Sequence, residues 1–114
     1  MQDSLRTITS DCNPLHAEDD YAAKKGHPSR VVFGMLSASF LSALAGVYLP
    51  GEHSLIHAVE IKLRKPVYIG DTLTIEGMVA DKSDAVKTIQ VKFTMTNQNG
   101  VKVAKGEMQI GVEE

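Results

Sequence analysis

Residues 31–49 read VVFGMLSASFLSALAGVYL, a run of nineteen residues without a charged side chain. A membrane-spanning helix needs about 20 consecutive apolar residues, so this run is nearly long enough to cross a membrane. Two glycines and three serines interrupt it, however, and amphipathic segments that need a covering partner follow it. The run therefore predicts a buried central helix, closed by Pro50-Gly51, and no membrane span.

Four segments after this run alternate apolar and polar residues, which is typical of half-buried strands. The first places a histidine and four apolar residues on one face: Leu55, His57, Val59, Ile61 and Leu63. The second and third do the same with Leu73, Ile75 and Val79, and with Ile89, Val91, Phe93 and Met95. A hairpin turn is expected at Asn97-Gln98-Asn99-Gly100. In the last segment the alternation changes phase near Val103-Ala104, which predicts a β-bulge.

The residues before the central run are helical in pattern. Residues 3–10 predict one short helix and residues 15–25 another, which Pro14 begins and Gly26 ends. A helical first half and a stranded second half indicate an α+β fold. We expect a single domain over residues 1–114, in which an antiparallel sheet wraps around the long central helix.

Composition narrows the classes of function. The net charge of −2 and the pI near 6.1 give no basic excess, so nucleic-acid binding is not expected. Cys12 is the only cysteine, which excludes an internal disulfide and provides no metal framework, so we expect no metal and a reducing, cytoplasmic compartment. No secretory signal is visible. A domain this small leaves much of its surface exposed, and a homodimer is expected.

One short motif carries acid–base chemistry. Asp11-Cys12-Asn13-Pro14-Leu15-His16 holds a carboxylate and an imidazole five residues apart around a rigid Asn-Pro kink. Two groups of different intrinsic pKa placed near one another can share proton transfers with a water molecule. Gly34 lies at the head of the central helix, where a backbone N–H can face developing negative charge.

Each of these residues also has a simpler interpretation. Asp11 could be a helix cap or part of an Asx turn. Asn13 could be a turn residue that fixes the kink at Pro14, and this interpretation explains it as well as a role in orienting the substrate does. Gly34 can serve close packing alone. Ser39 is explained better as a small packing residue than as a substrate contact, and Met35 as a core residue that could also line an acyl tunnel.

Several segments resemble the MaoC-like (R)-specific enoyl-CoA hydratases and dehydratases. The matching residues are Ser10–His16, Tyr21-Ala22, Val32–Ser39, Leu49–Gly51 and Lys65–Asp71, which together span most of the chain. The resemblance implies a hot-dog fold, which the expected sheet and helix already suggest. Phe33 departs from the family pattern, in which a histidine usually precedes the Gly-Met pair. The N-terminal strand that family members usually carry before the Asp11 motif is not found.

The resemblance implies a hydro-lyase that interconverts a trans-2-enoyl thioester and an (R)-3-hydroxyacyl thioester of CoA or acyl carrier protein. It implies that Asp11 and His16 hold one water, that Ser39 contacts the reacting region, and that no cofactor is needed. Six cations are candidates for binding phosphates: Lys24, Lys25, Arg30, Lys62, Arg64 and Lys65. Two alternatives stay open, a hot-dog acyl thioesterase and a non-catalytic acyl-binding or dimerisation module.

Overall fold

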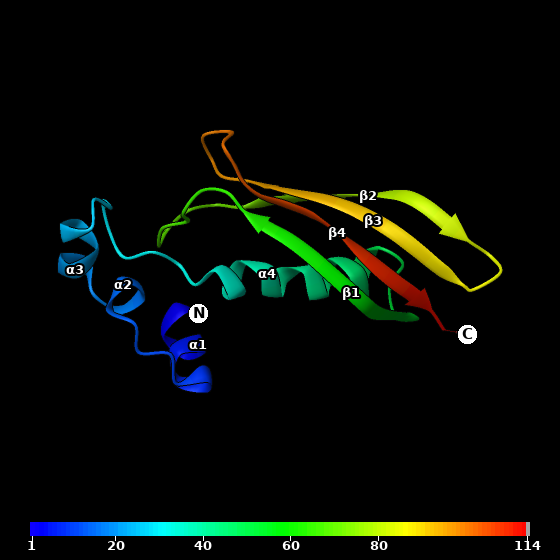
Figure 1. Cartoon of the computed structure of the whole chain (residues 1–114), viewed down its shortest axis with the longest axis horizontal. Helices are drawn as coiled ribbons and strands as arrows, with labels where there is room; N and C mark the ends of the chain where they lie inside the picture. Colours follow the sequence, from blue (N-terminus) through cyan, green and yellow to red (C-terminus); the bar gives the residue numbers. More distant parts are fainter. Residues whose placement is uncertain (114) are drawn as a thin grey trace.

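The protein is described by a computed structural model that covers residues 1–113 (Figure 1). Its helices are α1 (Gln2–Thr9), α2 (Pro14–Ala17), α3 (Asp19–Lys24), α4 (Gly34–Ala43) and the π-helical turn η1 (Leu44–Tyr48). Its strands are β1 (Ser54–Leu63), β2 (Thr74–Ser83), β3 (Thr88–Thr96) and β4 (Lys102–Val112). The strands form one antiparallel sheet in the order β1-β4-β3-β2, as expected of an α+β fold.

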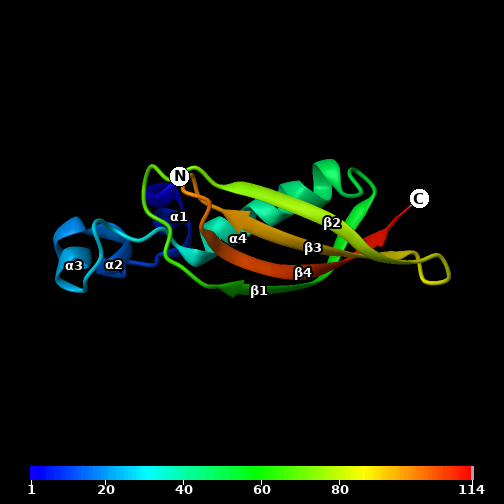
Figure 2. The same cartoon turned by 90° about the horizontal axis from the view of Figure 1, so that it is seen from above.

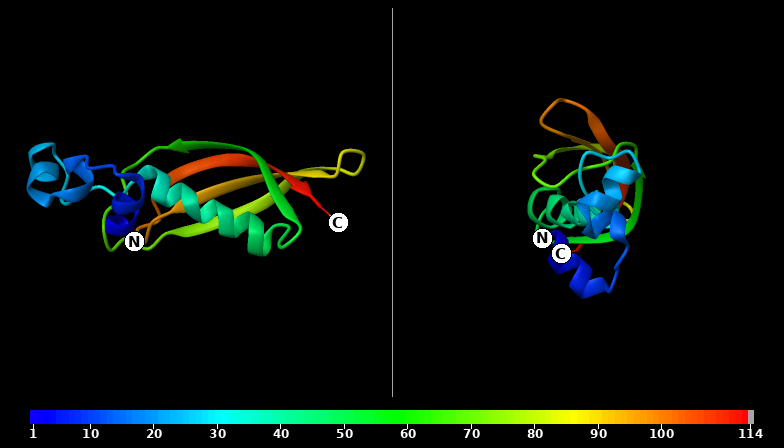
Figure 3. Two further views of the ribbon diagram at one scale, coloured as in Figure 1. Left: turned by 90° about the horizontal axis from the view of Figure 1, so that it is seen from below. Right: turned by 90° about the vertical axis from the view of Figure 1, so that its left-hand side faces the viewer.

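Helix α4 and η1 lie along one face of this sheet, as Figures 1 and 3 show. They place Leu41 and Ala45 in the core. The sheet contributes its buried residues from the two central strands: Ile89, Val91, Phe93, Met95, Val103, Ala104, Met108 and Ile110. The predicted inward face of the third strand is confirmed, and burial of these apolar side chains is the main source of stability.

The central helix begins later than predicted. Val31 forms an isolated bridge with Tyr68, and the Val32 N–H donates to the Val67 carbonyl at 2.7 Å. These two residues are therefore held extended, and the helix starts at Gly34 rather than at Val31. Sequence periodicity could not show this because the extended residues are as apolar as the helix. The structure has no helix long and apolar enough to cross a membrane within residues 1–113.

The helix predicted over residues 15–25 is two helices. Glu18 takes an extended conformation, with φ −130° and ψ 119°, and separates α2 from α3. Its backbone N–H still donates to the Pro14 carbonyl at 2.9 Å. In Figures 1 and 2, α1, α2 and α3 lie beyond the N-terminal end of α4, away from most of the sheet. Within residues 1–32, Gln2 and Ala22 are the only buried residues.

Strand β1 corrects the predicted inward face of the first strand. The register with β4 shifts between Ile56 and Ala58, so His57 is the extra residue of a bulge. Ile56 packs against the core in place of Leu55, and His57 is exposed. Because β1 is an edge strand, Val59 and Leu63 are also about half exposed, at 47% and 54%.

Strand β2 forms the other edge of the sheet. Leu73, just before it, and Ile75 pack against the core as predicted. Val79 is 44% exposed, and the register with β3 shifts immediately after it. The predicted inward position of Val79 is therefore only partly met.

The bulge predicted in the last strand is confirmed. Met95 pairs with Ala104 and Thr96 with Lys102, so Val103 is the extra residue in β4. Both Val103 and Ala104 are 1% exposed, which explains why both are apolar. The hairpin turn between β3 and β4 is also confirmed, with the Gly100 N–H donating to the Asn97 carbonyl at 3.0 Å.

Candidate active site at the start of helix α4

The first turn of α4 carries free backbone donors. The N–H groups of Leu36 and Ser37 both donate to the Phe33 carbonyl, at 3.0 and 3.2 Å. The N–H groups of Gly34 and Met35 have no acceptor within residues 1–113. This is expected at a helix start, where the first N–H groups lack intrahelical partners. The Gly34 N–H is thus available to a ligand.

Packing also requires glycine at this position. A Cβ atom on Gly34 would lie 2.5 Å from Cδ1 of Leu63 on strand β1. The absence of a side chain lets β1 approach the start of α4 closely. The two interpretations of Gly34 are therefore compatible, since one concerns its missing Cβ and the other its N–H.

His16, on α2, is held in one orientation. Its Nδ1 atom lies 2.7 Å from the Val31 carbonyl oxygen. A carbonyl oxygen can only accept, so Nδ1 carries the proton and the neutral ring has its lone pair on Nε2. The imidazole also packs against the ring of Phe33, with centroids 4.3 Å apart and planes tilted by 34°. Phe33 is buried and provides a fixed apolar surface for the ring.

His16 and Gly34 line the same cavity, which has a volume of about 300 Å³. Its remaining wall comes from the start of α4, the segment after β1 and the beginning of β4: Val31, Val32, Ser37, Leu63, Arg64, Lys65, Pro66, Val67, Val103 and Ala104. Two of these are cationic and exposed, Arg64 and Lys65. An imidazole, a free helix N–H and two positively charged side chains thus line one cavity.

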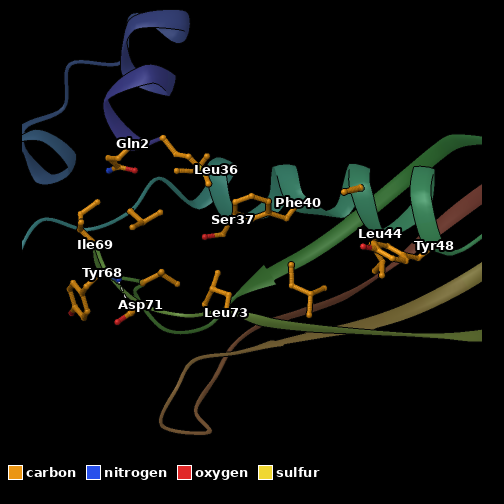
Figure 4. A pocket seen from close by; sticks show the side chains of 16 residues that line it. Gln2, Leu36, Ser37, Phe40, Leu44, Tyr48, Tyr68, Ile69, Asp71 and Leu73 are labelled. Atoms are coloured by element: carbon orange, nitrogen blue, oxygen red, sulfur yellow. Dashed lines mark hydrogen bonds between the residues drawn. The ribbon is translucent and has the colours of Figure 1, made fainter. Parts of the chain in front are cut away.

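A larger cavity of about 800 Å³ adjoins the first and is shown in Figure 4. It lies between α4 and the segment from Val67 to Ile75, and most of its lining side chains are apolar. Val32, Ser37 and Val67 line both cavities. Ser37 is 3% exposed, and its hydroxyl has no hydrogen-bond partner within residues 1–113. Sequence analysis missed Ser37, although it lies one helical turn after Gly34.

The motif residues Asp11 and Asn13 form consecutive turns. Asp11 Oδ1 accepts from the Asn13 N–H at 3.1 Å, and Asn13 Oδ1 accepts from the Leu15 N–H at 3.0 Å, capping α2. Both residues are exposed, and neither lines the two cavities. Within residues 1–113 no hydrogen bond joins Asp11 to His16. The structural interpretations of Asp11 and Asn13 are thus observed, and their catalytic and binding roles stay predictions.

Met35 and Ser39 lie on another side of α4. Met35 is 73% exposed, and the hydroxyl of Ser39 donates to the Leu36 carbonyl at 2.6 Å. Neither residue lines the two cavities described above. Their predicted contacts with substrate therefore have no support from the geometry of this chain.

Two of the six candidate cations already have partners, and Lys25 is one of them, since its Nζ lies 5.5 Å from the centroid of the Tyr21 ring. Arg30 binds Asp3 through Nη1 and Oδ1 at 2.8 Å, and its backbone N–H donates to Asp19. The hydrogen bond from Arg30 lowers the pKa of Asp3, and the same bond raises the pKa of Arg30. This pair ties α1 to the segment before α4 and leaves Arg64 and Lys65 as the cations at the cavity. Within residues 1–113 no three His, Cys, Asp or Glu side chains form a metal-binding group.

Comparison with known proteins decides the family. The family model for the MaoC like domain matches residues 4–101. The chain belongs to the MaoC-like family. An (R)-specific enoyl-CoA hydratase of Rhodospirillum rubrum is 36% identical over 109 residues, which are 92% of this chain and 72% of that protein. A protein of the same name from Aeromonas caviae is 36% identical over 91% of this chain and 78% of its own length.

Solved structures of MaoC-like proteins confirm the hot-dog fold. The (R)-hydratase of A. caviae involved in PHA biosynthesis superposes with a TM-score of 0.91 at 28% identity, covering 96% of this chain and 83% of that one. An unliganded R-hydratase of Pseudomonas aeruginosa also gives a TM-score of 0.91, at 29% identity, over 99% of this chain and 72% of that one. The expected enzyme class, a carbon–oxygen hydro-lyase, is confirmed with the family.

Proposed function

We propose that this MaoC-like protein interconverts a trans-2-enoyl thioester and the (R)-3-hydroxyacyl thioester by adding or removing water. One observation carries the proposal: the His16 imidazole and the free Gly34 N–H line one cavity. The names of its relatives, (R)-specific enoyl-CoA hydratase and 3-hydroxybutyryl-CoA dehydratase, support a reaction that runs in either direction, and the first name supports the (R) stereochemistry.

His16 is the base in the hydration direction. Because Nδ1–H is bound to Val31, the lone pair on Nε2 accepts a proton from water. The water oxygen then forms a bond to C3 of the enoyl thioester, and the electron pair of the double bond moves to the thioester oxygen. The proton that His16 took from water is then delivered to C2 of the enolate, with Asp11 as the candidate for passing it on, so both groups return to their starting state. In dehydration the same groups remove the C2 proton and protonate the leaving hydroxyl.

Gly34 stabilises the enolate oxygen. Negative charge grows on the thioester oxygen as the C3–O bond forms, and a preorganised N–H at a helix start is placed to bind it. The first turn of α4 offers this N–H without an internal competitor. The start of α4 therefore supplies the activation that the thioester needs.

Arg64 and Lys65 are the candidates for binding the phosphates of CoA or of the acyl-carrier-protein arm. They are exposed at the cavity that contains His16. Guanidinium and ammonium groups bind phosphate through charge-assisted hydrogen bonds. Replacing both by alanine is expected to raise the KM for crotonyl-CoA several-fold, with kcat nearly unchanged, and Lys24→Ala on α3 serves as the distant control.

The reaction is tested by the loss of enoyl-thioester absorbance with crotonyl-CoA, together with identification of the product. His16→Ala is expected to lower kcat by about 10²–10⁴, the usual contribution of a positioned acid or base. Asp11→Asn keeps an oxygen that can accept from the Asn13 N–H, so the turn persists while the charge is removed. A comparable loss of kcat in Asp11→Asn would establish its role, and unchanged turnover would restrict Asp11 to the turn.

The alternatives are outcomes of the same assay. Free CoA as the product would identify a thioesterase, and acyl binding without turnover would identify a binding module. Pairing with a second copy and a cytoplasmic location stay predictions, of which sedimentation of the purified protein tests the first.

A further inference from the structure

Gln2 has an unusual environment for a residue at the start of a surface helix. It belongs to α1, yet it is only 5% exposed. Its Nε2 atom donates to the carbonyls of His16 at 3.2 Å and Val31 at 2.9 Å, and its Oε1 accepts from the Phe33 N–H at 3.1 Å. Figure 4 shows Gln2 reaching from α1 to the end of the larger cavity near α4.

The three partners of Gln2 are the backbone groups that define the candidate site. Val31 O is also the acceptor for His16 Nδ1, so Gln2 and the imidazole share one anchor. Phe33 immediately precedes Gly34 and packs against the His16 ring. One amide therefore joins the helix that carries the base to the turn that presents the N–H donor.

Packing alone does not account for an amide at this position. Burying an amide in apolar surroundings is unfavourable unless its donors and acceptor are satisfied. Here both N–H donors and the oxygen have partners on two different segments. Attachment of α1 does not depend on these bonds alone, because the Asp3–Arg30 ion pair also holds α1 to the chain before α4.

We propose that Gln2 is a positioning residue that fixes the His16 imidazole relative to the Gly34 N–H. The proposal rests on the hydro-lyase function proposed above. A displacement of a catalytic group by about 1 Å can cost about 10²-fold in rate. Losing Gln2 removes one of the two side-chain bonds to the Val31 carbonyl and leaves the Phe33 N–H without its acceptor. The His16 imidazole and the turn that presents the Gly34 N–H then lose the side chain that links them.

Two variants and one control test the role. Gln2→Met keeps the length of the side chain and removes its three hydrogen bonds. Gln2→Glu keeps an acceptor for the Phe33 N–H and, when ionised, loses both donors to the carbonyls. Asp3→Asn is the matched control, because it weakens the neighbouring attachment of α1 without touching the partners of Gln2.

The readouts separate positioning from stability. With crotonyl-CoA, we expect kcat to fall about 10- to 100-fold in Gln2→Met, with KM within about twofold of the wild type. Gln2→Glu is expected to lose most of the same activity, and Asp3→Asn is expected to keep the wild-type kcat. Imidazole ¹⁵N spectra of the wild type should show the neutral His16 ring protonated at Nδ1, and Gln2→Met should show a mixture of tautomers.

Each outcome decides the matter. Wild-type kcat in a folded Gln2→Met variant would overturn the proposal, and so would a lower melting temperature with unchanged kcat and an unchanged tautomer. If the wild type itself does not hydrate crotonyl-CoA, the proposed function fails and the spectra decide alone. A tautomer mixture in Gln2→Met would then support the positioning role, and an unchanged Nδ1–H signal would refute it.

Discussion

Replacing Gly34 by proline removes the proposed oxyanion donor with little disturbance of the helix. Gly34 is the first residue of α4, where proline is favoured because the missing N–H has no intrahelical partner. The preceding residue, Phe33, has φ −54° and ψ 127°, a conformation compatible with a following proline. The Gly34 N–H has no acceptor within residues 1–113, so no protein hydrogen bond is lost.

Gly34→Ala is the matched control for this change. Both variants place a Cβ atom 2.5 Å from Cδ1 of Leu63, and both therefore require that side chain to move. Leu63 is 54% exposed on an edge strand and has room to rotate outward. Alanine retains the N–H and proline does not, so the difference between the two variants isolates the donor and the ring that replaces it.

The expected difference follows from the strength of one oxyanion hydrogen bond. Loss of such a donor costs about 10²–10³ in kcat, or roughly 3–4 kcal/mol. We therefore expect Gly34→Pro to hydrate crotonyl-CoA at least about 100-fold more slowly than Gly34→Ala, with similar melting temperatures. A higher KM with unchanged kcat would mean that the ring merely obstructs the cavity. Equal kcat values in the two folded variants would refute the role of the Gly34 N–H.

Two further predictions concern stability. In Gly106→Ala the new Cβ would collide with the Glu60 carbonyl oxygen of the paired strand, so we expect the free energy of unfolding in urea to fall by about 1–3 kcal/mol or more. In Gly46→Ala the new Cβ would meet only the Ser54 hydroxyl oxygen, at an ordinary contact distance of 4.0 Å, so this variant should be more stable by about 0.5–1 kcal/mol. Equal effects of the two substitutions would contradict this reasoning. The hydrogen bond from Arg30 lowers the pKa of Asp3 below its ordinary value of 3.8. The ion pair therefore stabilises the folded state fully above pH 3.8, and this stabilisation is lost as the pH falls through the lower pKa of Asp3 in the folded protein. The melting temperature of Asp3→Asn should therefore lie slightly below that of the wild type at pH 6 and converge with it in acid, and a gap that persists in acid would contradict the assignment.

The sheet was more predictable than the helices before it. Alternation along β3 specifies its inward residues, and the change of phase at Val103 specifies a bulge, because both follow from the period of a strand. The bulge at His57 could not be found in the same way, since both Leu55 and Ile56 are apolar and alternation fits either phase. The break at Glu18 depends on how α2 and α3 pack, which no local pattern records.

The candidate site was predictable only in part. The Asp11–His16 motif singled out His16, and the head of the apolar run singled out Gly34, but only the structure shows that the two line one cavity. Gln2 left no signal, since a glutamine in a polar helix is ordinary until the fold buries it. Ser37 looked like one of several small residues in α4. Asp11 was singled out as a catalytic residue with a turn as the alternative; the turn is observed, and the catalytic role stays a prediction that the assay above tests.

Because few side chains in residues 1–32 are buried, the activity can be lost by local opening while the rest of the fold stays intact. A segment with so few buried side chains opens locally at a free energy below that of global unfolding. His16, the proposed base, lies on this segment, while the sheet and α4 carry the core. The observed rate is therefore the intrinsic rate multiplied by the fraction of molecules in which the segment is closed. Amide hydrogen exchange should be fast in α1–α3 and slow in β3 and β4. A ligand that contacts His16 should slow exchange in α1–α3 and leave exchange in β3 and β4 unchanged.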